Sequence, residues 1–265
     1  MEIFRFRKFE VRNEKSAMKV NTDGVLLGAL MHMDGSERRL LDIGTGTGTI
    51  ALMAAQRLSE AAIKQKNGCT VPEDDDNTPS SSQTISAPDG FKIDAIDIDA
   101  PSAEEAALNF AASPWSTRLR AFHSALSDFR PDGEYDLIFS NPPFFTETLH
   151  SPSERKARSR HADALPLEEI ISFAAEHLSP LGRLALILPA SREKETAELA
   201  LRNGLHTSHI TEIHGSDRKP AYRVIMEISR RAGQNGEPLR ERVTINMNGK
   251  YSEQYLEIVH NYLLI

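Results

Sequence analysis

The chain carries one short stretch whose residue types can orient a nucleophilic nitrogen. The apolar run 136–140 ends at Asn141-Pro142-Pro143-Phe144. Two consecutive prolines cannot continue a strand, and each holds the residue before it extended. The Asn141 amide oxygen and a main-chain carbonyl can therefore accept both hydrogens of a planar exocyclic amine, while the ring of Phe144 stacks on its base or amide. The competing interpretation is a structural turn that closes a core strand.

A second stretch upstream has the composition of a ligand-binding turn. The mostly apolar strand-like residues 40–43 lead into Gly44, Gly46 and Gly48, after which a helical pattern begins. Glycines permit a tight strand-to-helix turn and the close approach of a ligand to the backbone. A dinucleotide-binding turn needs its third glycine where this chain has a threonine, and the acid Asp42 stands just before the bend. A nicotinamide site and a glycine-rich turn without function remain as alternatives.

The pattern Asp-x-Gly-x-Gly-x-Gly that begins at Asp42 resembles the cofactor loop of class I S-adenosyl-L-methionine (SAM) methyltransferases. In that family the glycines face the methionine part of the cofactor. Together with the Asn-Pro-Pro-Phe turn, the chain resembles the amino-methyltransferases, which methylate an exocyclic amine of adenine or guanine, or a glutamine amide. The resemblance implies SAM as cofactor, with Asp42 and the three glycines among its ligands.

The segment 19–28, Lys-Val-Asn-Thr-Asp-Gly-Val-Leu-Leu-Gly, also resembles this family. A similar segment precedes the glycine loop in the tRNA adenine methyltransferase branch and helps to close the cofactor pocket. The resemblance implies that Lys19, Thr22 and Asp23 bind the cofactor. From the residues alone, Thr22 or Asp23 is the N-cap of a short apolar helix over 25–30.

Two acids end the predicted strand 91–99. An acid at the end of the second strand of such a sheet accepts hydrogen bonds from ribose hydroxyls, and Asp97 is the best match, with Asp99 as second choice. The next turn departs from the family pattern. Ala125 stands where such enzymes often place an acid beside the cofactor adenine, and Asp128 is the nearest substitute.

Composition and charge limit the class of protein. The chain has 265 residues, a single cysteine, Cys69, and a formal net charge of −7. One cysteine excludes an internal disulfide and a cysteine zinc cluster, which suits a reducing compartment. The sequence shows neither a signal peptide nor an apolar stretch that could span a membrane. We therefore expect a cytoplasmic protein, without a metal and monomeric.

Residues 64–90 read as an insertion. They contain an acidic run, 73–76, three consecutive serines, 80–82, and almost no large apolar residue, which is typical of a disordered loop. A negative net charge argues against an RNA partner because phosphate binding needs Lys and Arg. Since much of the acidity lies in this insertion, the argument weakens once the insertion is set aside.

Two basic clusters are candidate RNA contacts. One follows the Asn-Pro-Pro-Phe turn, where basic side chains could grip phosphates while a base is presented; the other lies between two predicted strands. The alternative for both is a solvated surface run. The candidates are Arg155, Lys156, Arg158, Arg160, Arg218 and Lys219.

The rest of the pattern predicts the elements that position these residues. Strands and helices alternate as in an α/β, doubly wound, mostly parallel seven-stranded sheet with an antiparallel last strand, the Rossmann-like class I methyltransferase fold. One domain is expected to span 1–265. Both motifs then fall at carboxyl ends of strands, where such sheets bind ligands. Predicted helices span 49–63, 103–112, 166–178, 192–203 and 251–264; predicted strands span 3–11, 40–43, 91–99, 119–123, 136–140, 183–188, 208–213 and 222–229.

The resemblance implies an in-line displacement in which an amine attacks a sulfonium methyl, so the site needs orientation, dehydration and acceptors. The tract 19–30 and the corner 113–115 most resemble the bacterial tRNA(Val) (adenine-37-N6)-methyltransferase family, which implies a tRNA anticodon stem-loop as partner. The alternatives are a ribosomal RNA guanine-N2 methyltransferase, a release-factor glutamine methyltransferase, and a SAM-binding RNA chaperone or partner subunit. Release-factor enzymes usually carry Tyr where Phe144 stands, and Ala125 keeps the non-catalytic alternative open.

Overall fold

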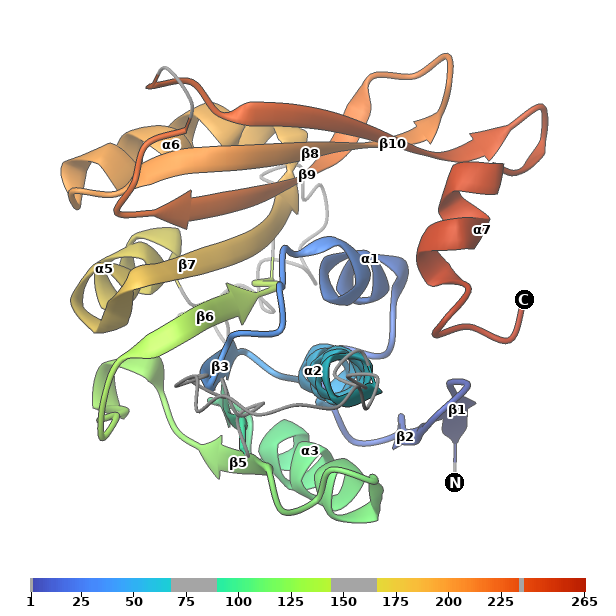
Figure 1. The fold of residues 1–265 in the computed structure, drawn as a ribbon, viewed down its shortest axis with the longest axis vertical. Helices are drawn as coiled ribbons and strands as arrows, with labels where there is room; N and C mark the ends of the chain where they lie inside the picture. The colour runs from blue at the N-terminus through green and yellow to red at the C-terminus, as the bar shows by residue number, and fades with distance from the viewer. Residues whose placement is uncertain (1, 68–89, 144–165, 234–235) are drawn as a thin grey trace, which may run out of the picture.

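The computed structural model describes residues 2–67, 90–143, 166–233 and 236–265 (Figure 1). Most of the predicted insertion, Phe144 and the basic cluster 155–160 lie outside these residues. The helices are α1 Thr22–Leu30, α2 Thr49–Asn67, α3 Ala100–Ala112, α5 Leu167–His177, α6 Glu193–Arg202 and α7 Glu253–Val259, with 3-10 turns η1 Leu126–Asp128 and η2 Ala190–Arg192. The strands are β1 Ile3–Arg5, β2 Glu10–Arg12, β3 Arg39–Ile43, β4 Lys92–Asp97, β5 Leu119–His123, β6 Tyr135–Ser140, β7 Leu178–Pro189, β8 His206–Ser216, β9 Ala221–Ser229, β10 Leu239–Met247 and β11 Lys250–Tyr251.

The central sheet has the strand order β11-β10-β8-β9-β7-β6-β3-β4-β5. The strands from β7 to β5 are parallel, and β9 runs antiparallel to both of its neighbours, β7 and β8. The seven strands from β8 to β5 confirm the predicted doubly wound sheet with its antiparallel strand. The sheet is wider than predicted, because β10 pairs with β8 and β11 with β10. The first four residues of β10 are exposed, so this strand lacks the apolar pattern of a buried one.

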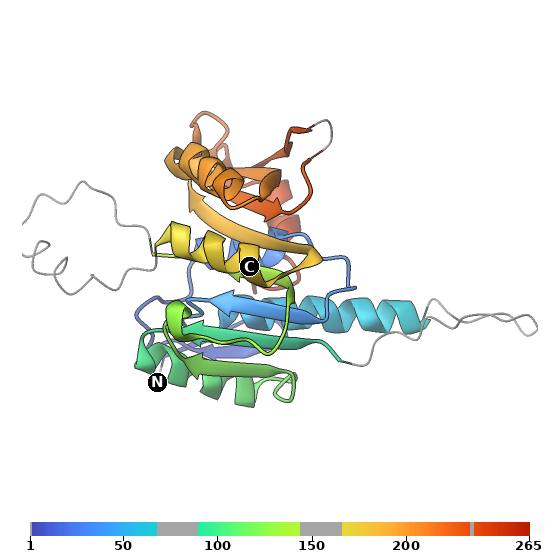
Figure 2. The same ribbon diagram turned by 90° about the vertical axis from the view of Figure 1, so that its left-hand side faces the viewer.

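Helices cover both faces of the sheet (Figure 1). On one face α1, α2, α3 and α7 enclose the larger apolar cluster; on the other, α5, α6 and η1 enclose the smaller. Figure 2 views the second face, with α5 and α6 in front of the strands. Consecutive strand residues alternate between the clusters, as Leu137 and Ile138 do in β6. Because both faces are buried, the core strands read as nearly continuous apolar runs.

Gly28 lets α1 pack closely on α2. A Cβ at Gly28 would lie 2.8 Å from Met53 Sδ and 3.1 Å from Met53 Cβ, whereas one at Gly24 would lie at an ordinary 3.7 Å from Ile50. The helix begins at Thr22, three residues before the predicted start at 25. Its N-cap is Asn21 in place of Thr22 or Asp23, and the Asn21 side chain accepts a hydrogen bond from the Gly24 N–H at 2.9 Å. The close packing fixes the first turn of α1 beside the first turn of α2.

The end of α2 corrects the boundary of the predicted insertion. The helix continues to Asn67, so residues 64–67 are helical and are not part of a loop. The alanines and lysine that precede this end are good helix formers, which explains the continuation. Among the described residues, no helix is long and apolar enough to cross a membrane, and no group of His, Cys, Asp or Glu is arranged to hold a metal ion.

Candidate functional site

The two bends follow neighbouring strands at the same edge of the sheet. In the parallel pair of β3 and β6, Ile43 lies opposite Ser140, and the Ser140 hydroxyl donates a hydrogen bond to the Ile43 carbonyl at 2.7 Å. Gly44 and Asn141 are the next residues in the chain. The glycine bend, residues 44–48, and the target turn, residues 141–143, are therefore adjacent at the carboxyl edge.

The three glycines of the glycine bend have different surroundings. All have a positive φ, between 57° and 79°, which favours glycine. A Cβ at Gly48 would lie 2.5 Å from Phe110 Cε1, and one at Gly46 would lie 3.3 Å from Ser16 Oγ. Gly44 is exposed and has no heavy atom within 4 Å of that position. Gly46 and Gly48 thus permit protein packing, whereas Gly44 borders open space.

Asp42 is a fully buried carboxyl at the start of this bend. One oxygen, Oδ2, accepts a hydrogen bond from the Thr45 hydroxyl at 2.8 Å, whereas the buried Oδ1 has no partner among the described residues. Burial raises the pKa of Asp42 to about 7. Hydrogen bonding by the Thr45 hydroxyl and by the Ala51 main chain opposes the rise, and the nearby Asp97 charge adds to it. The site therefore holds an unsatisfied acceptor that is suited to a cationic or hydrogen-bonding ligand.

Asp97 and Asp99 occupy different roles at the end of β4. The Asp97 carboxylate accepts hydrogen bonds from the Gly46 N–H at 2.8 Å and the Asp99 N–H at 2.9 Å, so it contacts the glycine bend. Its pKa is raised, mainly by burial. Asp99 is the N-cap of α3, accepting from the Ser102 N–H and hydroxyl. Of the two candidates, Asp97 is the one beside the glycine bend; its ribose contact stays a prediction.

Residues 13–20 form a strap, which contacts the glycine bend at Gly46. Lys19 Nζ donates to the main-chain carbonyls of Asn13, at 2.7 Å, and Glu14. Lys19 therefore closes the strap on itself, and its predicted contact with the cofactor stays a prediction. The strap also contacts the target turn, because Asn141 Nδ2 lies 3.6 Å from Met18 Sδ.

The two α1 candidates are separated by their neighbours. Thr22 is exposed at the first position of the helix. The Asp23 carboxylate pairs with the Arg223 guanidinium at 2.7 Å and so links α1 to β9. This ion pair fixes the start of α1 against the sheet, and a cofactor contact of either side chain stays a prediction.

The target turn is described as far as Pro143. Asn141 is 7% exposed and Pro142 is buried, whereas Pro143 is exposed. The stacking role of Phe144 and the RNA contacts of Arg155, Lys156, Arg158 and Arg160 fall outside the described residues.

The second basic cluster lies at the same edge of the sheet. Arg218 and Lys219 are exposed in the turn between β8 and β9. On β7, Leu186 pairs with Ser140 of β6, and Pro189 pairs with Arg223 near the start of β9. The β8–β9 turn therefore lies at the carboxyl edge, as the target turn does.

The turn after β5 carries the departure from the family pattern. Ala125 precedes η1, and the Ser124 N–H donates to the Asp97 carbonyl at 3.0 Å, which places this turn beside the end of β4. Asp128 is exposed at the end of η1.

The sequence interpretation missed three buried polar residues of α3. Ser102, Glu105 and Asn109 are 1–2% exposed and share one helix face through their spacing of three and four. Asn109 bonds to the Arg12 backbone and donates to the Thr47 carbonyl at 2.8 Å, so it ties β2 to the glycine bend. The sequence did contain a sign of this face, because Ser102, Glu105 and Asn109 form a polar stripe next to the apolar stripe of Ala103, Ala106 and Phe110.

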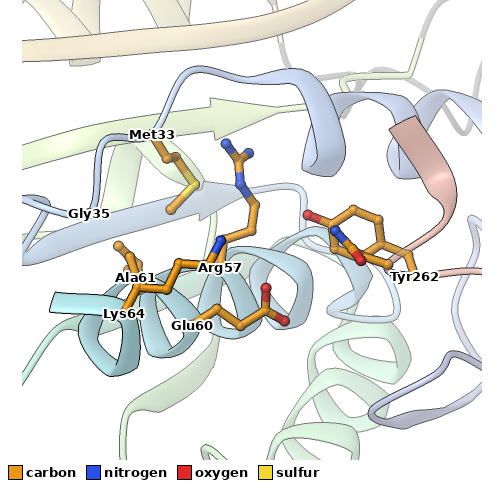
Figure 3. A pocket seen from close by; sticks show the side chains of 9 residues that line it. Met33, Gly35, Arg57, Glu60, Ala61, Lys64 and Tyr262 are labelled. Carbon is orange, nitrogen blue, oxygen red and sulfur yellow. The ribbon is translucent and has the colours of Figure 1, made fainter. Parts of the chain in front are cut away.

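A separate cavity of about 230 Å³ lies at the opposite edge of the sheet (Figure 3). It is lined by Met33, Arg57, Lys64 and Tyr262, among others. Arg57 Nη1 donates to the carbonyls of Gly28 and Met31, at 3.0 and 2.8 Å, and so closes the end of α1. The lining residues belong to α2 from Arg57 onward, to the segment before β3 and to the segment after α7, so the cavity is not part of the candidate site.

The residues at the carboxyl edge fit SAM. Open space borders Gly44, the buried Asp42 Oδ1 lacks a partner, and the Asp97 carboxylate ends β4 beside the bend. These features suit a ligand with a cationic amino acid part and a ribose.

Comparison with known proteins agrees with this geometry. The family described as "Methyltransferase small domain" matches residues 81–216. A protein of Christiangramia forsetii is 34% identical, with 98% of this chain and 97% of the relative covered. One of Flavobacterium psychrophilum is 38% identical, covering 86% of each. Both relatives are named tRNA1(Val) (adenine(37)-N6)-methyltransferase.

Solved structures show the same fold. A predicted O-methyltransferase of Agrobacterium tumefaciens has a TM-score of 0.57 at 16% identity, covering 91% of this chain and 96% of that one. The 16S rRNA N2 G1207 methyltransferase of T. thermophilus has a TM-score of 0.51 at 18% identity, covering 87% and 50%. The fold is therefore that of the class I SAM methyltransferases. With the identity to its relatives extending over nearly its whole length, the chain belongs to the tRNA1(Val) (adenine(37)-N6)-methyltransferase family.

Proposed function

We propose that the protein transfers the methyl group of SAM to N6 of adenine 37 in the anticodon loop of tRNA(Val). The observation that carries the proposal is the position of Gly44 and Asn141. Gly44 follows Ile43 and Asn141 follows Ser140, and Ile43 and Ser140 lie opposite each other on neighbouring strands. A cofactor on the glycine bend and an amine on the target turn would then share one edge of the sheet. The full-length likeness to relatives of that name supports the choice of substrate.

The residues of the chain divide the work between cofactor and substrate. Gly44, Asp42 and Asp97 would hold SAM, which supplies an electrophilic methyl group on a sulfonium. The Asn141 amide oxygen and the Pro142 carbonyl accept the two N6 hydrogens and so direct the nitrogen lone pair. Phe144 stacks on the adenine. No side chain needs to remove a proton beforehand, because the amine becomes acidic only as positive charge develops on it.

RNA must present the adenine out of its stack. An anticodon loop is unpaired, so extruding its adenine costs less than opening a duplex. The exposed side chains of Arg218 and Lys219 lie at the edge that carries the target turn and would contact the phosphates of the stem-loop. We further propose that the protein acts as a monomer in the cytoplasm, where tRNA resides.

A transfer assay with methyl-labelled SAM tests the proposal against its alternatives. The three substrates are bulk tRNA, ribosomal RNA and release factor, each incubated with the full-length protein. We expect label in tRNA only. Label in release factor or ribosomal RNA alone would overturn the tRNA assignment, and SAM binding without transfer to any substrate would favour a non-catalytic RNA chaperone.

A further inference from the structure

We propose that Glu105 of α3 is a positioning residue that holds the strap against the glycine bend, so that the affinity for SAM depends on a carboxylate outside the cofactor pocket. The inference rests on the proposed use of SAM at this bend. It adds a buried residue that the sequence motifs do not contain.

Three consecutive main-chain N–H groups of the strap converge on this one carboxylate. Oε1 accepts from Glu14 and Lys15, and Oε2 accepts from Ser16, each at 2.8 Å. Glu105 is 2% exposed. Burial would raise the pKa of this carboxyl, but the three N–H donors outweigh it and hold the pKa below its ordinary value. The carboxylate is therefore ionised at neutral pH, and its bonds to the strap are charge-assisted.

The held segment touches the parts of the site that must act together. Ser16 Oγ and the Met18 carbonyl lie 3.3 and 3.4 Å from the position of a Cβ on Gly46. The Ala17 N–H donates to Ser102 Oγ at 3.2 Å, one helical turn before Glu105. Met18 Sδ contacts Asn141 Nδ2 of the target turn. A strap fixed in this way shapes both the glycine bend and the target turn, although Glu105 itself touches neither.

The substitution Glu105→Gln isolates this role. It keeps the shape of the side chain but replaces one acceptor oxygen with an NH₂ group, which faces an N–H donor and cannot accept from it. At least one strap hydrogen bond is lost and the charge that strengthened the others is removed. Glu104→Gln is the matched control, because it makes the same change one residue earlier, where the side chain is 68% exposed and pairs loosely with Lys15 at 3.7 Å.

The test uses two measurements on the full-length protein that need no RNA. The first is the affinity for S-adenosylhomocysteine by calorimetry, and the second is the rate of tryptic cleavage after Lys15, with and without that ligand. For Glu105→Gln we expect affinity to fall about tenfold and cleavage to become about tenfold faster, from the loss of a charge-assisted hydrogen bond. We expect Glu104→Gln to match the wild type in both. In the transfer assay the KM for SAM should rise by the same factor as the affinity falls, while kcat changes less than about threefold.

Wild-type affinity and cleavage rate in Glu105→Gln would overturn the proposal, as would a loss of kcat with an unchanged KM for SAM. If Glu105→Gln does not fold, Ser102→Ala removes the acceptor of the Ala17 N–H and should shift both measurements in the same direction by a smaller factor; no shift would overturn the proposal. If the wild type binds S-adenosylhomocysteine but methylates no tRNA, the proposed function fails while these two measurements still decide the role of Glu105.

Discussion

Asp94 and Asp97 lie three residues apart on β4, and the protein surrounds their charges differently. The Asp94 carboxylate pairs with Arg120 at 2.9 Å and accepts a hydrogen bond from the Tyr135 hydroxyl at 3.1 Å. Asp97 forms no ion pair among the described residues; its partners are the N–H groups of Gly46 and Asp99. The carboxylate toward the amino end is thus neutralised by cations, whereas the one at the carboxyl end is not.

The same contrast appears on the neighbouring strand β3. Before the strand, the buried Glu37 pairs with Arg183. At its other end Asp42 has no cation partner among the described residues, keeps an unpartnered oxygen, and has its pKa raised to about 7 by burial and, in part, by Asp97. Near the amino edge, Asp94 and Glu37 are therefore paired with arginines, whereas Asp42 and Asp97, at the carboxyl ends of the same strands, have no cation partner among the described residues.

The largest effect is expected at the target turn. Asn141→Ala removes an acceptor that acts on the amine, so methyl transfer should fall about a thousandfold, as for loss of one preorganised polar contact. The affinity for SAM should be nearly unchanged, since the glycine bend is intact. Single-turnover transfer and calorimetry measure the two quantities, and a large loss of affinity would contradict the role assigned to Asn141.

The raised pKa of Asp42 predicts a dependence of stability on pH. Because the native carboxyl binds its proton more tightly than an unfolded one, its stabilising contribution is complete below about pH 4 and is lost as the pH rises to about 7. The loss approaches about 4 kcal/mol in the free energy of unfolding. Urea unfolding at pH 5 and pH 8 should show the wild type losing more stability than Asp42→Asn. Equal losses in the two proteins would refute the assignment.

At the amino end, Asp94→Asn should cost about 2 kcal/mol of stability, because it removes a buried charge to which Arg120 and the Tyr135 hydroxyl donate hydrogen bonds. The affinity for S-adenosylhomocysteine should stay at the wild-type value. Asp132→Asn is the control: its carboxylate pairs with Arg39, which also lies 3.8 Å from the Asp94 carboxylate, but it is 77% exposed, so the change should cost less than about 1 kcal/mol. Thermal unfolding and calorimetry compare the two, and a loss of affinity in Asp94→Asn would erase the contrast between the ends of β4.

The smallest effect is expected at Asp97. There the change to Asn should lower the affinity for the ligand and leave the stability of the protein intact, the reverse of what is expected at Asp94. Asp97→Asn weakens an acceptor for ribose hydroxyls, so the affinity for S-adenosylhomocysteine should fall about tenfold. Stability at pH 8 should not decrease, since a buried carboxylate whose pKa is raised is replaced by a neutral group. Destabilisation comparable to that of Asp94→Asn would show that both acids serve the fold alike.

The sequence was sufficient for seven strands of the sheet and for the position of both bends. Apolar strands ending in Gly44 and Asn141 placed each motif at a carboxyl end, and parallel pairing then made the bends neighbours. The strand β5 was predicted with its observed bounds. These features follow from local patterns that a single sequence contains.

The remaining features depend on contacts between distant segments. Glu105 was assigned to a plain helix because its partners, 89–91 residues away in the sequence, carry no signal in a side chain: they are main-chain N–H groups. The different constraints on Gly46 and Gly48 come likewise from Ser16 and Phe110. The first four residues of β10 are exposed and three of them are charged, so its position in the sheet depends on its pairing with β8.

The central claim is that the glycine bend and the target turn form one site that acts on adenine 37. Its most direct test is to methylate a tRNA(Val) transcript with the purified protein, digest it, and locate the added methyl group by mass spectrometry. The account predicts N6-methyladenosine at position 37, and no methylation of a transcript that carries guanine there. A methyl group at another position, or equal methylation of both transcripts, would contradict it.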